Sequence, residues 1–144
     1  MAKIERMAKS DSYEILDLWM RSVTKANSFI EDDFWQKHYD EAREQCLNGK
    51  DNYKYIDDGR IVGFICVDNE NRVAGVYVDP DYQNRGIGTA LLQFIQTQYS
   101  LLHLDVYMKN KNSLDFATYC GFVIDGAIRN PINNEVQYTM IWTE

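Results

Sequence analysis

The chain has 144 residues, with 15 Lys or Arg against 22 Asp or Glu, and therefore a formal net charge of −7 at pH 7. This is the length of one domain, 1–144, and a net-acidic chain without a Lys/Arg block lacks the surface that nucleic-acid binding requires. Because its longest apolar stretch, residues 61–67, is too short to cross a bilayer and residues 1–13 lack the apolar segment of a secretory signal, we expect a cytoplasmic protein without a nucleic-acid or membrane partner.

The residue pattern in the first third of the chain predicts a short strand followed by two helices. Residues 4–9 have the pattern of the strand, and Asp11 with Glu14 has the spacing of a capping box for the first helix. The acidic run at residues 31–33 suits the start of the second helix, which ends at Gly49. The apolar face of this second helix consists of Phe34, Trp35, His38, Tyr39 and Ala42.

The residue pattern in the rest of the chain predicts strands interrupted by two helices. Strands are expected around residues 53–55, at 61–67 after the Asp58-Gly59 turn, and at 73–78, where Asp79-Pro80 ends the run. The expected elements that follow are a helix at 87–99, a strand at 101–107, a helix at 112–120 closed by Gly121, and strands at 122–128 and 136–142. The order βααβββαβαββ predicts an α/β fold with a mixed sheet and helices on both faces.

Cysteine and histidine are too sparse to suggest a disulfide framework or a metal centre. Cys46, Cys66 and Cys120 are odd in number and widely spaced, which predicts reduced thiols. His38 and His103 are the only histidines, and neither stands beside a cysteine. We therefore expect no structural zinc site.

A polar loop with two glycines, Gly86 and Gly88, joins the strand at 73–78 to the helix at 87–99. Glycine allows a ligand to approach the backbone closely, and the free N–H groups and dipole at a helix start suit a pyrophosphate. A Walker A loop needs Gly-Lys-Ser/Thr, whereas Thr89 follows Gly88, and a dinucleotide fingerprint needs a small residue where Leu91 stands. The residues themselves leave open another phosphate site or a plain tight turn.

The segment Gln-Asn-Arg-Gly-Ile-Gly at residues 83–88 resembles the Q/R-x-x-G-x-G/A signature of the GCN5-related N-acetyltransferase (GNAT) superfamily. The preceding Val-Asp-Pro, the later Asn110 and the Gly-Phe pair at 121–122 agree in order and spacing, and so does the order of elements. The residues at 19–23 and Phe29 are similar to those of small stand-alone bacterial members.

This resemblance implies acetyl-coenzyme A as cosubstrate and no metal. The loop at 84–89 would wrap the pyrophosphate, and the strand at 76–78 would pair with the pantetheine arm where the sheet splays from the strand at 101–107. The Val78 N–H would stabilise the oxyanion formed from the thioester. The residues that the resemblance assigns to the cosubstrate are Val76, Tyr77, Val78, Gln83, Asn84, Arg85, Gly86, Ile87, Gly88, Thr89 and Asn110.

Acetyl transfer to an amine needs a base, because a lysine-type amine has a pKa of about 10.4. His103, Asp105 and Tyr107 share the polar face of the strand at 101–107. Some family members that acetylate protein N-termini carry an acidic base five positions before the residue matching Asn110, and this makes Asp105 the predicted catalytic base, directly or through a water. His103 is an alternative base, and an ion pair with a nearby cation is an alternative role for Asp105.

The general acid is where the chain departs from the family pattern N-x-x-A/S-x-x-x-Y-x-x-x-G-F. Ala117 stands at the position of the tyrosine that would protonate the coenzyme thiolate. Tyr119 lies two residues on, roughly 200° around a helix. We predict a catalytic role for Tyr119 if the helix end unwinds, with Tyr77, Tyr107 or water as alternatives.

The resemblance thus predicts an N-acetyltransferase that moves an acetyl group to a primary amine by direct attack. Because Ala117 lacks a proton to donate, the alternative is an acetyl-coenzyme A-binding sensor with little transfer; a nucleotide-binding domain is a weaker rival. Acceptor specificity would depend on residues 22–33 and 129–135. The acids at 31–33 either attract a cationic amine or favour their own helix start. The acceptor (protein N-terminus, lysine, polyamine or antibiotic) and the choice of monomer or homodimer stay open.

Overall fold

A computed structural model describes the backbone of residues 1–144 and every side chain except those of residues 45–47. The strands are β1 (Ala2–Arg6), β2 (Asp51–Asp57), β3 (Arg60–Val67), β4 (Arg72–Val78), β5 (Leu101–Tyr107), β6 (Val123–Arg129) and β7 (Val136–Thr143). The helices are α1 (Ser12–Ala26), α2 (Asp32–Lys37), α3 (Tyr39–Asn48), α4 (Ile87–Gln96) and α5 (Lys111–Tyr119), with 3-10 turns η1 (Lys9–Asp11) and η2 (Pro80–Tyr82).

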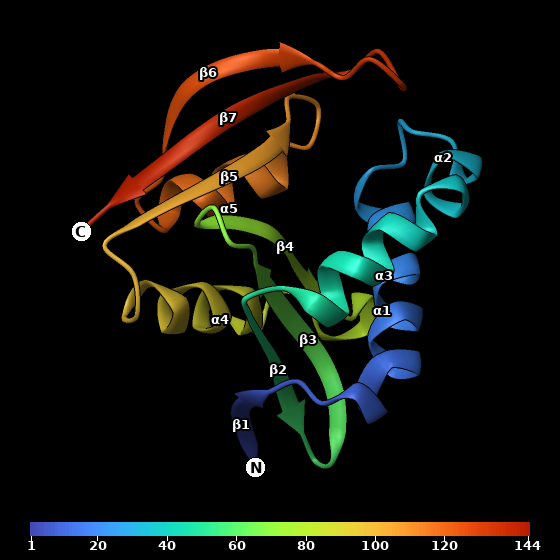
Figure 1. Cartoon of the computed structure of the whole chain (residues 1–144), viewed down its shortest axis with the longest axis vertical. Helices are drawn as coiled ribbons and strands as arrows, with labels where there is room; N and C mark the ends of the chain where they lie inside the picture. Colours follow the sequence, from blue (N-terminus) through green and yellow to red (C-terminus); the bar gives the residue numbers. More distant parts are fainter.

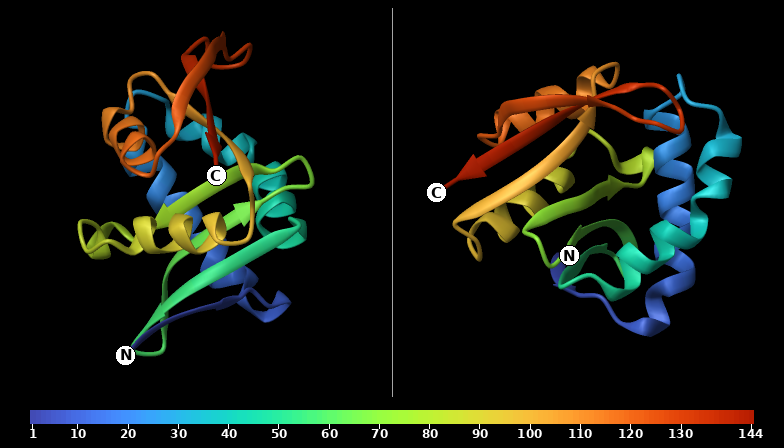
Figure 2. Two further views of the ribbon diagram at one scale, coloured as in Figure 1. Left: turned by 90° about the vertical axis from the view of Figure 1, so that its left-hand side faces the viewer. Right: turned by 45° about the horizontal axis from the view of Figure 1, so that its top comes forward.

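The strands form one mixed sheet in the order β1-β2-β3-β4-β5-β7-β6, in which β4 and β5 are the parallel pair (Figure 1). Helices α1 to α3 cover one face and α4 with α5 the other, as the two views of Figure 2 show. The predicted α/β fold and element order are therefore confirmed, apart from a split in the second helix. No helix of the described chain is long and apolar enough to cross a membrane.

Strands β4 and β5 separate soon after they meet, as the resemblance implied. Their pairing is limited to Arg72 with His103 and Val73 with Leu104. On the other side of β4, Cys66 pairs with Gly75 but Val67 pairs with Val73, so β4 carries a β-bulge. A bulge bends its strand and increases the local twist. The bulge lies where β4 turns away from β5, and it accompanies the opening of the sheet.

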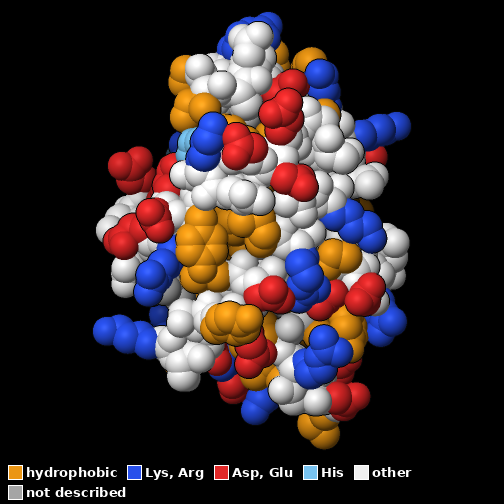
Figure 3. Space-filling model, turned by 90° about the vertical axis from the view of Figure 1, so that its right-hand side faces the viewer, with side chains coloured by type: hydrophobic (Ala, Val, Ile, Leu, Met, Phe, Trp, Pro, Cys, Tyr) orange, Lys and Arg blue, Asp and Glu red, His pale blue; other side chains and the backbone are white. Residues whose placement is uncertain are grey.

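Each face of the sheet has its own hydrophobic core. Under α4 and α5, apolar residues of β3 to β5 pack with Leu91, Leu92 and Phe122, and under α1 to α3 another cluster surrounds Phe64 and Trp19. The alternation predicted for β5 is confirmed: Leu102, Leu104 and Val106 are buried, and their neighbours in the strand are half-exposed. Figure 3 shows the outer face over α1 and α3, where acidic and basic side chains surround a central hydrophobic cluster.

The predicted capping box at the start of α1 is wrong. The Asp11 carboxylate does not cap α1; it accepts hydrogen bonds from the Ala8 N–H (2.8 Å) and from Lys54 Nζ (2.7 Å). Lys54 is buried, and a buried ammonium needs a counter-ion. The need of Lys54 for a counter-ion therefore overrides the local capping pattern. The first strand, predicted at 4–9, ends at Arg6, and Lys9 begins η1 instead.

The second predicted helix is interrupted at His38. Its ring Nδ1 lies 2.7 Å from the Phe34 carbonyl oxygen, and its backbone (φ −103°, ψ 13°) leaves the helical region. The chain then starts α3 at Tyr39. Cys66 and Cys120 are buried, and Cys46 lies outside the described side chains, so the prediction of three reduced thiols stays a prediction.

Candidate functional site

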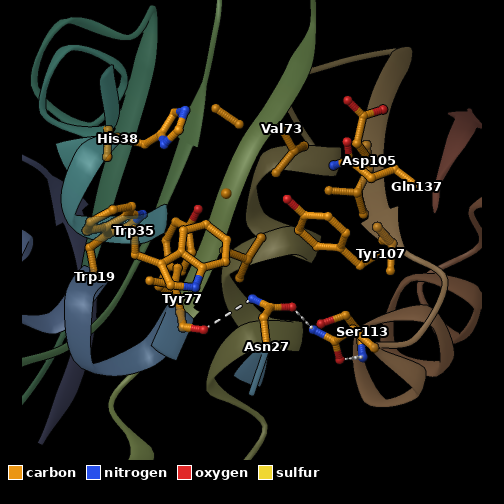
Figure 4. A pocket seen from close by; sticks show the side chains of 18 of the residues that line it. Trp19, Asn27, Trp35, His38, Val73, Tyr77, Asp105, Tyr107, Ser113 and Gln137 are labelled. Carbon is orange, nitrogen blue, oxygen red and sulfur yellow. Dashed lines mark hydrogen bonds between the residues drawn. The ribbon is translucent and has the colours of Figure 1, made fainter. Parts of the chain in front are cut away.

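A pocket of about 390 Å³ opens where β4 and β5 separate, and we call it the splay pocket. One side is aromatic, and the opposite side carries polar groups of β5 and the start of α5 (Figure 4). Its aromatic side chains are Trp19, Phe34, Trp35, His38, Tyr77, Tyr107 and Phe116. Its polar side chains are Asn27, Glu41, Arg72, Asp105, Asn110, Ser113, Asn130 and Gln137.

The edge of β4 that faces the opening is free of strand pairing. The Asp79 N–H donates to the Val62 carbonyl oxygen on β3 (2.8 Å), and the alternation of a strand therefore turns the N–H groups of Val76 and Val78 the other way, toward the opening. Pairing with β5 ends at Val73. This edge presents main-chain donors and acceptors that an extended ligand can pair with. Of the residues predicted here, Val76 and Tyr77 line the splay pocket, and Val78 continues the edge.

The loop between η2 and α4 leads directly into the first turn of that helix. Asn84 (φ 64°) and Gly86 (φ 79°) are left-handed, and Gly86 starts α4 without a side-chain cap. Within the described chain, the N–H groups of residues 87–89 donate no hydrogen bond to the protein, as expected for the first turn of a helix. No atom lies within 4 Å of the place where a Gly86 Cβ would stand. The loop therefore leaves room for an anion beside a helix start.

The residues predicted to bind the pyrophosphate offer backbone N–H donors, and Arg85 also offers a positive charge. The Arg85 guanidinium lies 4.9 Å from the centre of the Tyr82 ring, and the Arg60 guanidinium lies 5.8 Å from the same ring. Two cations thus stand at the Tyr82 ring, in the turn that precedes the loop, and both favour a negative ligand. Gln83 begins this loop and Thr89 lies in the first turn of α4, and neither lines the splay pocket.

Asp105 lies in the wall of the splay pocket, on β5, and forms an ion pair. Its Oδ1 is 2.7 Å from Arg72 Nη1, with side-chain exposures of 31% for Asp105 and 37% for Arg72. The ion pair that was an alternative for Asp105 is thus present, and it joins β5 to the start of β4. His103 does not line the splay pocket. Its main-chain N–H donates to the Asn71 carbonyl oxygen (2.8 Å).

Asn110 links two helices across the splay pocket. Its Oδ1 accepts the Ser113 N–H (3.1 Å) as the cap of α5, and its Nδ2 donates to Asn27 Oδ1 (2.9 Å). Asn27 in turn donates to the Val23 carbonyl oxygen (3.3 Å), and the dashed lines in Figure 4 follow this chain. The sequence pointed to Asn110 but not to Asn27, because 83 residues separate them.

Tyr119 does not reach the splay pocket. Helix α5 stays helical through Tyr119, and this side chain is 76% exposed on the outer surface. The unwinding that its predicted catalytic role required does not occur. Ala117 is fully buried in the core under α5.

Tyr107 is the phenol on β5 that does line the splay pocket. Its hydroxyl oxygen accepts a hydrogen bond from Asn133 Nδ2 (2.8 Å). Burial raises the pKa of Tyr107, although the Asn133 hydrogen bond acts in the opposite direction. The phenol therefore stays protonated at neutral pH, and its own proton remains available as a donor.

Trp35 contributes a feature that the sequence did not indicate. Its indole N–H is a buried donor for which the described residues provide no acceptor. The ring makes edge contacts with Trp19 (6.1 Å) and Tyr107 (6.4 Å) in the splay pocket. A buried donor without a partner is costly, so a ligand with a suitable oxygen would gain by binding here. The described His, Cys, Asp and Glu side chains form no group of three that would hold a metal.

Comparison with known proteins gives consistent matches. The model of the acetyltransferase (GNAT) family matches residues 11–122. The peptidyl-lysine N-acetyltransferase YiaC of Escherichia coli (strain K12) is 32% identical over 121 residues, covering 84% of this chain and 83% of that protein. The peptidyl-lysine N-acetyltransferase YjaB of Salmonella typhimurium is 24% identical over 127 residues, covering 88% and 86%.

Solved structures show the same fold. Apo-form YjaB from Escherichia coli superposes with a TM-score of 0.85 at 18% identity, covering 99% of this chain and 97% of that one. The PaiA N-acetyltransferase from Thermoplasma acidophilum, in complex with coenzyme A, gives a TM-score of 0.80 at 17% identity, covering 100% and 99%.

Proposed function

Because this chain belongs to the acetyltransferase (GNAT) family and is an acetyl-coenzyme A-dependent N-acetyltransferase, we propose that its acceptor is a lysine side chain of a peptide or protein. The observation that carries the proposal is the buried indole N–H of Trp35, a residue of the splay pocket, for which the described side chains and backbone provide no acceptor. A peptide supplies carbonyl oxygens that can accept this hydrogen bond, whereas a protonated polyamine carries donors only. The naming of the curated relatives as peptidyl-lysine N-acetyltransferases supports the same acceptor.

The donor side fits the loop and the open edge of β4. The N–H groups of residues 87–89, with Arg85 beside them, would hold the diphosphate, and Val76 would pair with the pantetheine arm. When bound, acetyl-coenzyme A supplies the activated acetyl thioester. The Val78 N–H, which faces the opening, would donate to the oxygen on which negative charge develops. The Ser113 N–H holds the Asn110 side chain in the splay pocket, where Asn110 would contact the thioester end of the pantetheine arm.

On the acceptor side, Asp105 would remove the proton of the lysine ammonium, which otherwise prevents the amine from attacking the acetyl thioester. A lysine amine is largely protonated at neutral pH, since its pKa is about 10.4. The aromatic rings of Trp19, Trp35 and Tyr107 favour a cation near their faces, and Asp105 adds a negative charge. Arg72 competes with the incoming ammonium for this carboxylate, so the acceptor must share or displace that ion pair.

Tyr107 is our candidate for the proton donor that is missing at Ala117. Its phenol lies in the splay pocket, and burial keeps it protonated. The Asn133 amide donates to its oxygen and thereby leaves the phenol proton free to point elsewhere. A coenzyme-binding sensor with little transfer remains the second candidate function, and the observation that favours it is the buried alanine at position 117.

Thermal unfolding and thiol release together test this function. We expect acetyl-coenzyme A to raise the melting temperature, ATP and NAD to leave it unchanged, and a lysine peptide to trigger thiol release. Gly86→Glu should abolish the shift by acetyl-coenzyme A. Gly59→Glu is the matched control, because Gly59 is also left-handed (φ 78°) with no atom within 4 Å of its Cβ position. A shift by acetyl-coenzyme A without thiol release from any amine would favour the sensor.

A further inference from the structure

A second hollow adjoins the splay pocket, and we call it the flanking hollow. It lies between the α1–α2 connection with α2 on one side and the β6–β7 connection on the other, and its volume is also about 390 Å³. In Figure 1 these two connections approach each other at the top of the molecule. Phe34, His38 and Ile132 belong to the walls of both cavities. A short peptide that places one side chain in the splay pocket can therefore reach the flanking hollow with another.

The floor of the flanking hollow is apolar. It includes the buried Ile30 and the Phe29 ring, which packs edge-on against Tyr107 (5.7 Å between ring centres). Phe34 and His38 are stacked 4.3 Å apart and form the partition toward the splay pocket. Ile132 is 66% exposed at the lip. This lining suits the methylene groups of a long side chain.

The rim of the flanking hollow has an excess of negative charge. Asp33 forms an ion pair with Lys37 (2.9 Å), and Glu135 forms one with Lys109 (3.2 Å), whose ammonium also lies 5.9 Å from the Phe29 ring. Glu31 is the lining carboxylate that makes no ion pair within the described chain. An apolar floor with one unpaired carboxylate at the rim complements a side chain with an aliphatic stem and a cationic head.

The Trp35 ring lies against the partition between the two cavities. It is 4.9 Å from the Phe34 ring, and the residues that the structure describes provide no acceptor for its indole N–H. A peptide carbonyl between two neighbouring side chains would provide one. The Trp35 indole N–H, the wall that the two cavities share and the negative charge of the rim therefore all suit a peptide with a basic side chain.

We propose that the flanking hollow binds a lysine or arginine side chain within two residues of the acceptor lysine, with Glu31 as the partner of its charged head. This inference rests on the proposed peptidyl-lysine function and adds a sequence preference to it. Because the rim is exposed, the ion pair is screened, and we expect about a three- to five-fold preference for a basic over a neutral flanking residue at low salt.

The test compares kcat/KM for peptides that differ at one flanking position. Each peptide carries one acceptor lysine with Arg, Gln or Glu at the first or second position on either side; an acetylation-blocked N-terminus removes the competing amine. We expect the Arg peptide to be favoured over the Glu peptide at one of these positions, and the ratio to fall toward one in 0.5 M NaCl. Glu31→Gln should remove most of the preference, and Glu31→Lys should reverse it.

Glu14→Gln is the matched control, since Glu14 is an exposed acid at the opposite end of α1 and changes net charge equally. Ile132→Ser tests the apolar lip that the two cavities share and should lower kcat/KM for the Arg and Gln peptides alike. If lysine peptides are acetylated with the same ratio in the native protein and in Glu31→Gln, the subsite is refuted and the peptidyl-lysine function stands. If no lysine peptide is acetylated but spermidine or an aminoglycoside is, the proposed function fails, and the subsite fails with it.

Discussion

Replacement of Asp105 by Asn separates a catalytic from a structural role of this carboxylate. The amide keeps the size of the side chain and can still accept a hydrogen bond from Arg72, but it cannot take a proton from the acceptor amine. The side-chain exposures of 31% and 37% place the ion pair in a solvent-screened position. Loss of its charge should therefore cost at most about 1 kcal/mol of unfolding free energy.

The effect on catalysis should be much larger. At pH 7 fewer than about one in a thousand lysine amines is unprotonated, given a pKa of about 10.4. A positioned base contributes about 10²–10⁴-fold to the rate, so we expect kcat/KM of Asp105→Asn to fall by roughly 100-fold or more at pH 7. The deficit should shrink as the pH rises toward 10, because the substrate then loses its proton without help.

Thiol release with a lysine peptide between pH 7 and 10, together with urea unfolding, measures both effects. Arg72→Gln is the companion variant, since it removes the ion pair but keeps the carboxylate. If Asp105→Asn and Arg72→Gln lose activity to the same extent, Asp105 acts by fixing the strands and not as a base. A native-like rate for Asp105→Asn at pH 7 would contradict the assignment directly.

Three further changes probe the site and its scaffold. Gly75→Ala should lower the unfolding free energy by about 1–3 kcal/mol and raise the KM for the acceptor, because the added Cβ overlaps the Tyr77 ring in the splay pocket; urea unfolding and steady-state kinetics measure this. Tyr119→Phe should keep kcat within about two-fold of the native value, since the phenol is exposed outside the pocket, and a large loss would reinstate it as the acid. Burial raises the pKa of Asp11, but hydrogen bonds from Lys54 and the Ala8 N–H outweigh this and leave the pKa below its ordinary value. Asp11→Asn should therefore cost about 1–3 kcal/mol at pH 7, and this difference should shrink as the pH falls below about 4; an unchanged difference in urea titrations at pH 3 would contradict it.

The local signals of the chain were enough for most of the fold. Period-two alternation located β5 residue for residue, and the Asp58-Gly59 turn placed β2 next to β3. The paired glycines located the start of α4 at Gly86. Local patterns failed at two places: the distant Lys54 binds the Asp11 carboxylate that was predicted to cap α1, and the backbone at His38 leaves the helical region in a helix that its apolar spacing predicted as continuous.

The same distinction between local sequence and tertiary packing holds for the candidate site. The sequence by itself predicted a glycine loop at the start of α4 that suits an anion, because such a loop is built from consecutive backbone groups, and it placed Asp105 on the polar face of β5. Only the tertiary structure decided which distant residues meet there: it set Arg72 against Asp105, joined Asn27 to Asn110, and left Tyr119 outside. It also created the splay pocket, where Trp35 and the β6–β7 connection come together from distant parts of the chain. The physical reason is that a strand or a helix start is fixed by neighbours along the chain, whereas a pocket is fixed by how separate elements pack.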